Sequence, residues 1–221
     1  MIINGFLRFV NESKYDVLAE SVASAIILFI KHKGSGKMVR RVRHLAGSPT
    51  PVDFVLLVNV VESSQLPPAI SKKLPWESIN FENNGFSVDA NSYIPMDSPN
   101  AEVKMDVVVR SEADVNYESL YFKLLDTVRH EIEHIISKAS GSGETRKESQ
   151  DSYVYFLLPD EIPSMVSGMR LSASKRGVPI ETEFANYLQP ILASGFITKD
   201  QYEKVMAAWK EFAFSHFPDT K

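Results

Sequence analysis

One long amphipathic helix is predicted for residues 116–139, NYESLYFKLLDTVRHEIEHIISKA. Apolar side chains recur there every three or four positions, which is the period of a helix with one side against a protein core. Two of the five histidines of the chain fall within this helix, in the stretch VRHEIEHIIS (128–137), and nearly opposite the apolar stripe. The stripe itself consists of Tyr121, Leu125, Val128, Ile132 and Ile135.

His130 and His134 are four residues apart, and residues at this spacing are neighbours on a helix surface. Two imidazole rings placed in this way can bind one ion without a bend in the backbone. With Glu131 directly after the first histidine, the pattern is an HExxH motif. In this motif the histidines bind Zn²⁺ and the glutamate acts as general base towards a metal-activated water. The alternative interpretation is a solvent-exposed helix face that carries two histidines by chance.

The composition limits the kinds of site and partner. The chain has no cysteine, so disulfides, thiolate zinc sites and cysteine nucleophiles are excluded, and a metal must use His, Asp or Glu. The net charge of −4 is too small to indicate that the whole molecule binds nucleic acid or a membrane surface. The N-terminus MIINGFLRFVNESK has no signal-peptide pattern, and the apolar run 22–30 is too short to span a bilayer. We therefore expect a cytoplasmic protein that is not secreted by a signal peptide.

The segments around the HExxH helix predict an α+β fold. A first helix is expected from Asn11 or Ser13 to about residue 33. Strands are expected at VDFVLLVNVV (52–61) and AEVKMDVVVR (101–110). Asn84-Gly85 indicates a β-hairpin, because both residues tolerate positive φ angles. The predicted order is a helix, an antiparallel sheet, a long helix and then a helical C-terminal part.

Three parts are expected along the chain, which together form one compact domain. Residues 1–138 contain the first helix, the sheet and the HExxH helix. Residues 139–152 are polar and rich in glycine and serine, which predicts a mobile loop. Residues 153–221 are expected to be helical, and Thr198 and Gln201 fit a capping box at the start of the last helix.

With its HExxH motif the chain resembles the zincin metallopeptidases, whose active-site helix follows an antiparallel sheet with an exposed edge strand. The metzincin extension HExxHxxGxxH is absent, because Ser137 stands at the glycine position and no third histidine follows. The aspzincin motif GTxDxxYG is absent as well. The remaining similarity is to the gluzincins, in which a glutamate from a later helix completes the zinc site.

Glu161 is the best candidate for this third ligand. It lies in LLPDEIPSMVSG (157–168), at the first turn of a predicted helix. Asp160 and His216 are competing ligands. Acidic residues are also common in a first helical turn because the helix dipole favours them, so the position of Glu161 does not by itself assign a ligand role.

The HEIEH motif, the polar break and the hydrophobic stretch that leads into PDEIP are also similar to small metallopeptidases inferred in tailed bacteriophages. This similarity covers about residues 100–190, and its second motif lacks the NExxSD form of well-studied gluzincins. This similarity implies that the protein is located in the host-cell cytoplasm or in the virion. It also implies two kinds of partner, namely a protein or peptide substrate and other phage proteins.

The sequence thus predicts a zinc-dependent metallopeptidase in which Glu131 is the general base and strand 101–110 is the sheet edge that pairs with an extended substrate. A second donor to the oxyanion is expected besides the zinc. The candidates are Tyr153, Tyr155, Arg146 and His216.

The alternative from a different class is a non-catalytic structural or interaction protein with the zincin fold, such as a virion component. The basic segment 31–44 is interpreted as a helix C-terminus followed by a surface loop, so nucleic acid is not an expected partner.

Overall fold

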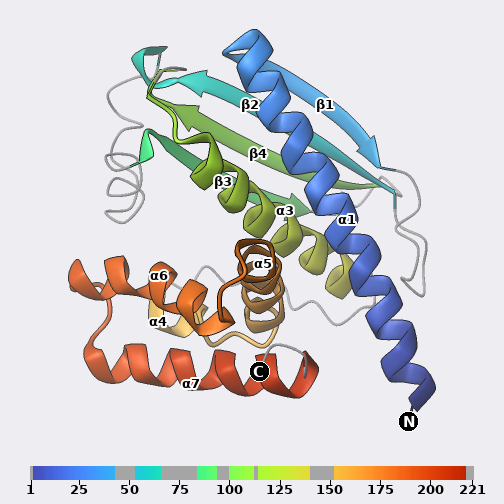
Figure 1. Cartoon of the computed structure of the whole chain (residues 1–221), viewed down its shortest axis with the longest axis vertical. Helices are drawn as coiled ribbons and strands as arrows, with labels where there is room; N and C mark the ends of the chain where they lie inside the picture. The colour runs from blue at the N-terminus through green and yellow to red at the C-terminus, as the bar shows by residue number, and fades with distance from the viewer. Residues whose placement is uncertain are drawn as a thin grey trace.

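A four-stranded sheet, two long helices on one of its faces and a group of C-terminal helices make up the described part of the chain (Figure 1). The computed structural model describes residues 2–42, 53–65, 84–93, 100–111, 114–139 and 152–217. The elements are α1 (Ile2–Lys33), β1 (Gly36–Val42), β2 (Phe54–Glu62), η1 (Ser63–Gln65), β3 (Phe86–Tyr93), β4 (Ala101–Val109), α3 (Tyr117–Ala139), α4 (Ser152–Tyr155), α5 (Glu161–Arg176), α6 (Ile180–Ala193) and α7 (Lys199–His216). The α+β class and the predicted order of elements are confirmed.

The sheet is mixed, with the strand order β1-β2-β4-β3. β1 pairs with β2 and β3 pairs with β4 in antiparallel fashion, whereas β2 and β4 are parallel. The prediction of an antiparallel sheet was therefore wrong at its centre. The prediction that residues 101–110 form the sheet edge was also wrong, because β4 is paired on both sides. Among the described strands β1 and β3 are the two edges, and the polar residues Asp89, Asn91 and Ser92 of β3 suit an edge strand.

The basic segment 31–44 was interpreted as a helix C-terminus followed by a surface loop. The first part is confirmed, because Lys31, His32 and Lys33 form the last turn of α1, but residues 36–42 form β1 rather than a loop. The side chains of β1 alternate between exposed and less exposed and end in the buried Val42, which is the period of a strand. Arg40 points towards α1, where its guanidinium donates hydrogen bonds to the carbonyl (2.9 Å) and the hydroxyl (2.7 Å) of Ser21. Lys37 and Arg41 are therefore exposed on one side of an edge strand, and Arg40 on the other side is fixed to α1.

Asn84 and Gly85 lead into β3. Gly85 has a φ of 72°, as the turn prediction required, and its carbonyl accepts a hydrogen bond from the Arg110 amide (2.8 Å). The Asn84 carbonyl accepts from the Asn116 amide (3.2 Å) just before α3. These two bonds fix β3 beside the start of α3. The first arm of the predicted hairpin lies outside the described residues.

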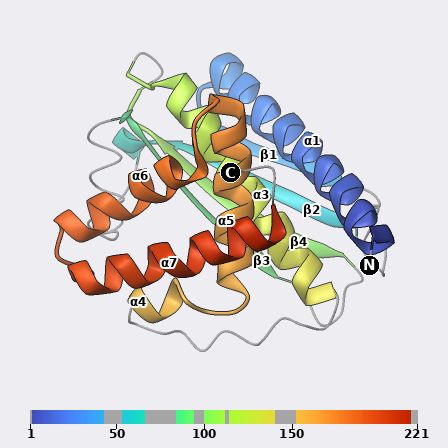
Figure 2. The same cartoon turned by 60° about the horizontal axis from the view of Figure 1, so that its bottom comes forward.

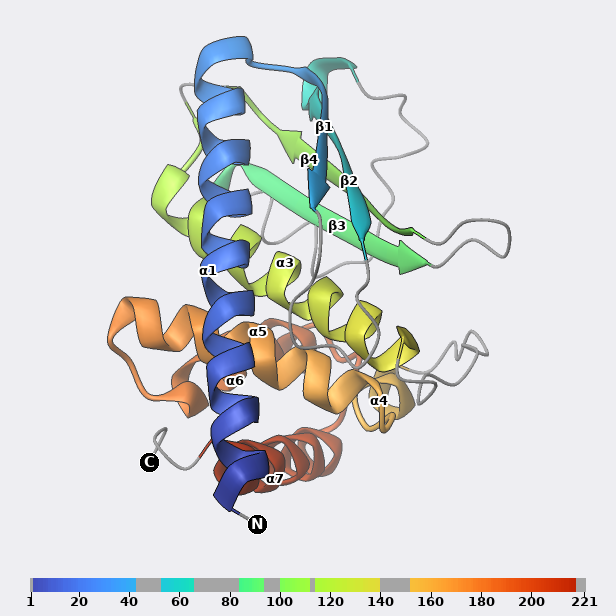
Figure 3. The same ribbon diagram turned by 90° about the vertical axis from the view of Figure 1, so that its right-hand side faces the viewer.

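α1 and α3 lie on the same face of the sheet and cross it side by side (Figures 1 and 3). The apolar stripe predicted for α3 faces the core, where Leu125, Val128, Ile132 and Ile135 are buried. α1 begins at Ile2, earlier than the predicted start at residues 11–13, because no proline interrupts residues 2–13. None of the described helices is both long enough and apolar enough to cross a bilayer.

The C-terminal helices form a second apolar cluster; these helices lie below α3 in Figure 1 and in front of it in Figure 2. The indole of Trp209 is fully buried there and donates a hydrogen bond to the Phe156 carbonyl (3.0 Å), which ties α7 to the end of α4. The predicted capping box is confirmed, because the Thr198 hydroxyl accepts from the Gln201 amide and the Gln201 side chain accepts from the Thr198 amide. The segment 140–151, which contains most of the predicted mobile loop, lies outside the described residues.

A charged bridge connects α1, α3 and α5. Asp16 on α1 accepts from Arg129 Nε on α3 (3.1 Å) and from Arg170 Nη2 on α5 (2.5 Å). The Arg129 side chain is fully buried and also pairs with Glu133 (2.8 Å). Since a buried guanidinium requires a compensating anion, Asp16 fixes α1 against both of the other helices.

Replacement of Asp16 by asparagine should lower the free energy of unfolding by about 2–4 kcal/mol, because the buried Arg129 then loses the carboxylate counter-charge of Asp16. Urea denaturation of the full chain measures this change. The matched control is Glu20→Gln, since Glu20 on the same helix pairs with Lys175 of α5 at a partly exposed position. The control should cost less than about 1 kcal/mol. Equal effects of the two variants would contradict a special role of Asp16.

Candidate metal centre

His130 and His134 meet on the side of α3 that faces away from the sheet. Their ring centroids are 4.6 Å apart, and the two Nε2 atoms are 3.0 Å apart. This side is covered by α5, so that only 9% of His130 and 3% of His134 remains exposed. A solvent-exposed helix face is therefore the wrong interpretation of the pair.

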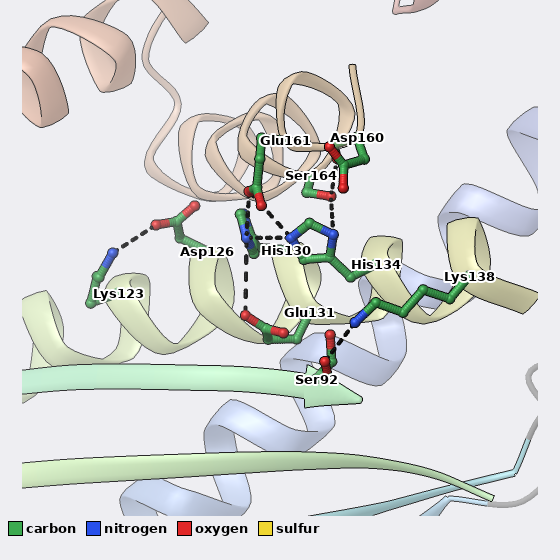
Figure 4. Close-up of polar contacts among 10 residues, drawn as sticks. All are labelled: Ser92, Lys123, Asp126, His130, Glu131, His134, Lys138, Asp160, Glu161 and Ser164. Carbon is green, nitrogen blue, oxygen red and sulfur yellow. Dashed lines mark hydrogen bonds and ion pairs between the residues drawn. The ribbon is translucent and has the colours of Figure 1, made fainter. Parts of the chain in front are cut away.

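Glu161 approaches the two histidines from the first turn of α5 (Figure 4). Its Oε2 atom lies 3.3 Å from His134 Nε2 and 3.6 Å from His130 Nε2. The Glu161 side chain is fully buried. These three residues form a group whose ligand atoms could hold one metal ion.

The distances within this group match a tetrahedral ion. Zn²⁺ binds imidazole nitrogen and carboxylate oxygen at about 2.0–2.2 Å, so two ligand atoms at a tetrahedral angle lie about 3.3–3.4 Å apart. The three distances between Nε2, Nε2 and Oε2 are 3.0, 3.3 and 3.6 Å, which differ from this value by a few tenths of an ångström. Two imidazoles and one carboxylate are also the donor types that zinc prefers when thiolates are absent. The residues therefore fit a zinc ion.

The charge state of Glu161 also suits a cation ligand. Burial alone would raise the pKa of Glu161, but a hydrogen bond with His134, the charges of His130 and His134 and a hydrogen bond with Tyr155 outweigh it. Together they hold the pKa of this carboxyl at about 2. Glu161 is thus an anion at neutral pH although it is fully buried.

Glu131 lies beside the group on the side nearer the sheet (Figure 4). Its Oε1 atom is 4.0 Å from His130 Nε2, and 4% of the residue is exposed. A carboxylate at this distance does not displace the three ligand atoms. It can instead accept a proton from a molecule that lies between it and the centre.

The competing ligands occupy other places. Among the described residues, the potential ligand group contains neither Asp160 nor His216. Asp160 precedes Glu161, and its backbone carbonyl accepts a hydrogen bond from the Ser164 hydroxyl (2.9 Å). His216 is exposed at the end of α7, where Nδ1 donates to the Phe212 carbonyl (2.9 Å).

Of the four candidate oxyanion donors, Tyr155 is placed at the centre by its hydrogen bond with Glu161. Tyr153 packs against the apolar cluster of the C-terminal helices. His216 lies at the end of α7, and Arg146 lies outside the described residues.

Gly168 allows α5 to approach α3 closely. A Cβ atom at this position would lie 2.5 Å from the backbone carbonyl oxygen of Asp126, closer than a side chain tolerates. Ser164 and Ser172, one turn to either side, are also small and buried, so a row of small residues at four-residue spacing faces α3. This row was not recognised in the sequence, although the spacing of Ser164, Gly168 and Ser172 is visible there.

The edge strand β3 runs beside the centre, and its outer side has a regular set of backbone groups. The antiparallel register and the bond between Gly85 and Arg110 direct the backbone groups of residues 87, 89, 91 and 93 towards β4. Those of residues 86, 88, 90 and 92 therefore point outwards. One of them, the Ser92 carbonyl, accepts a hydrogen bond from Lys138 Nζ (2.6 Å), one turn after His134 (Figure 4).

No protein-family model, curated protein or solved structure matches this chain. The resemblance to the zincins is therefore supported by the HExxH motif and by the geometry of His130, His134 and Glu161, whereas the resemblance to bacteriophage metallopeptidases stays a prediction from the sequence.

Replacement of Gly168 by alanine should lower both stability and zinc affinity. The new methyl group forces α5 away from Asp126, which costs about 1–3 kcal/mol of unfolding free energy and moves Glu161 away from the histidines. The matched control is Ser174→Ala at an exposed position of the same helix, which should be neutral or slightly stabilising because alanine favours helices. Thermal denaturation and zinc titration measure the two effects. A Gly168→Ala protein that is more stable and binds zinc normally would contradict this role.

Proposed function

We propose that this protein is a zinc-dependent metallopeptidase of the gluzincin-like type, with His130, His134 and Glu161 as zinc ligands and Glu131 as general base. The observation that carries the proposal is the convergence of two Nε2 atoms and one Oε2 atom at 3.0, 3.3 and 3.6 Å, with a fourth buried side chain, Glu131, next to them. A purely structural zinc site has no chemical need for this second carboxylate. Its presence in the HExxH position favours catalysis.

Zinc bound by these residues supplies a Lewis acid that polarises a peptide carbonyl and activates a water molecule for attack. The Glu131 carboxylate accepts the proton that this water loses, and it returns the proton to the leaving amine. Because Glu131 is 4% exposed, bulk water competes little for the proton during the transfer.

Tyr155 is the best-placed residue for stabilising charge on the substrate. Its O–H group donates a hydrogen bond to Glu161, which holds the phenol at the centre, and it would turn from this carboxylate to donate to an oxyanion.

The substrate is a protein or peptide that pairs in extended form with the outer side of β3. The outward backbone groups of Val88 and Ala90 provide donors and acceptors for such a strand. The Ser92 carbonyl is already bonded to Lys138, so pairing at this position requires the lysine to move.

Purified full-length protein is expected to contain one zinc ion per chain and to cleave a casein-like substrate. Glu131→Gln should keep the zinc but lose activity by about 10²–10⁴-fold, because the ligands remain and only the general base is removed. Metal analysis and a proteolysis assay of both proteins measure this. The matched control is Glu118→Gln, at an exposed position in the first turn of α3, which should retain full activity.

Two outcomes would overturn the proposal. Protein without zinc affinity would exclude the metal centre. Zinc at one per chain without cleavage of any member of a peptide library would instead support a non-catalytic protein with a structural zinc site.

The third ligand is tested by two neighbouring substitutions. Glu161→Gln should weaken zinc binding by at least about 100-fold, because it removes the anionic ligand, whereas Asp160→Asn should change it little. Competition with a chelator measures both affinities. A larger loss in the Asp160 variant would assign the third ligand to Asp160 and contradict the geometry.

A further inference from the structure

Ser164 contacts the candidate centre from the side opposite the metal ligand atoms. The side chain is fully buried, one turn after Glu161 on α5. Its Oγ atom lies 3.3 Å from His134 Nδ1 and 2.9 Å from the backbone carbonyl oxygen of Asp160 (Figure 4). No sequence argument had singled out this residue.

The position of each proton follows from these two contacts. A carbonyl oxygen can only accept a hydrogen bond, so the single hydrogen of the Ser164 hydroxyl is directed to the Asp160 carbonyl. The lone pairs of Oγ then face His134 Nδ1, which must donate. An ion can bind at His134 Nε2 only when that nitrogen gives up the proton that it donates to Glu161, and the single proton of the neutral ring is then on Nδ1, where it donates to Ser164. The Nε2 lone pair then faces His130 and Glu161, where the ion would bind.

We propose that Ser164 is a positioning residue that fixes the tautomer and the ring orientation of His134 for metal binding. This inference rests on the zinc centre proposed above and adds the device that prepares one of its ligands. Ligand histidines usually donate their second N–H group to a carboxylate, a backbone carbonyl or a water molecule. Here a serine hydroxyl takes that place, and the Asp160 carbonyl orients the hydroxyl in turn.

This arrangement also gives Asp160 a function that does not require its carboxylate. The carbonyl of residue 160 and the hydroxyl of residue 164 are joined across one helical turn, and Glu161 lies between them on the same turn. The turn thus provides a ligand at Glu161 and the support of another ligand at Ser164. Because the Ser164 hydroxyl is neutral, it holds the imidazole without adding a negative charge to the buried centre.

The direct test is the Nδ1–H group of His134 in zinc-loaded protein, measured by two-dimensional ¹⁵N–¹H NMR of the imidazole nitrogens. The wild-type protein should show a slowly exchanging His134 Nδ1–H signal, because Ser164 accepts this hydrogen bond, and Ser164→Ala should exchange the same proton rapidly with solvent. Ser164→Thr, which retains the hydroxyl, should restore the wild-type pattern. Ser167→Ala is the matched control, because Ser167 is an equally buried serine on α5 for which the structure shows no contact with either histidine.

Zinc affinity is the second measurement. Ser164→Ala should bind zinc about 10–100-fold more weakly than the wild type, as expected for loss of a group that orients a ligand, while Ser164→Thr and Ser167→Ala should bind normally. His134 protonated at Nε2 in the wild-type protein would overturn the inference. An unchanged exchange rate of the His134 Nδ1–H proton and an unchanged zinc affinity in Ser164→Ala would overturn it as well.

Failure of this inference can be distinguished from failure of the proposed function. If wild-type protein binds zinc and cleaves peptides but Ser164→Ala behaves in the same way, only the role of Ser164 is excluded. If wild-type protein binds no zinc, the metal centre is excluded, and with it the purpose assigned to the Ser164 contact.

Discussion

The close contact between α3 and α5 at Gly168 is the constraint on which the candidate centre depends. The HExxH motif provides two ligands on α3, but the third comes from a helix that begins more than twenty residues later in the chain. Because a single methyl group at Gly168 would meet the Asp126 carbonyl at 2.5 Å, the distance between the helices is fixed near its lower limit. At this distance both Glu161 and Ser164 reach His134. On α5, Glu161 lies about two turns before Gly168, and Ser164 lies about one turn before it.

Asp16 adds an electrostatic constraint to this steric one. It bridges Arg129 on α3 and Arg170 on α5. Arg129 is next to His130 in the sequence, and Arg170 follows Gly168 by two residues. A carboxylate that holds both guanidinium groups opposes sliding of α5 along α3, which packing of small residues alone would resist less strongly. Two kinds of force therefore act on the same contact: the row of small residues sets its distance, and the charged bridge sets its register.

Much of the fold and part of the centre could be predicted because they depend on local patterns. The stripe of α3, the histidine pair and the capping box at Thr198 follow from helical spacing alone. The parallel pairing of β2 and β4 could not be predicted, since it depends on which strands meet over long distances in the chain. The basic segment was assigned to a loop because its charge was given more weight than its alternation. The role of Ser164 was hidden for a different reason: a buried serine has no sequence signal until its partner across the helix contact is known.

The burial of the donor set has an energetic consequence that links folding to metal binding. Glu161 is a fully buried anion, and its compensation comes from two imidazoles and the Tyr155 hydroxyl. Imidazoles compensate a carboxylate fully only when they are protonated, whereas they bind a metal only when they are neutral. A divalent cation satisfies both requirements at once, because it neutralises the carboxylate while it accepts the lone pairs of both rings. The centre is therefore better suited to a bound cation than to a proton shared between the histidines, and the ion would connect α3 to α5 at the point where Gly168 has already brought them together.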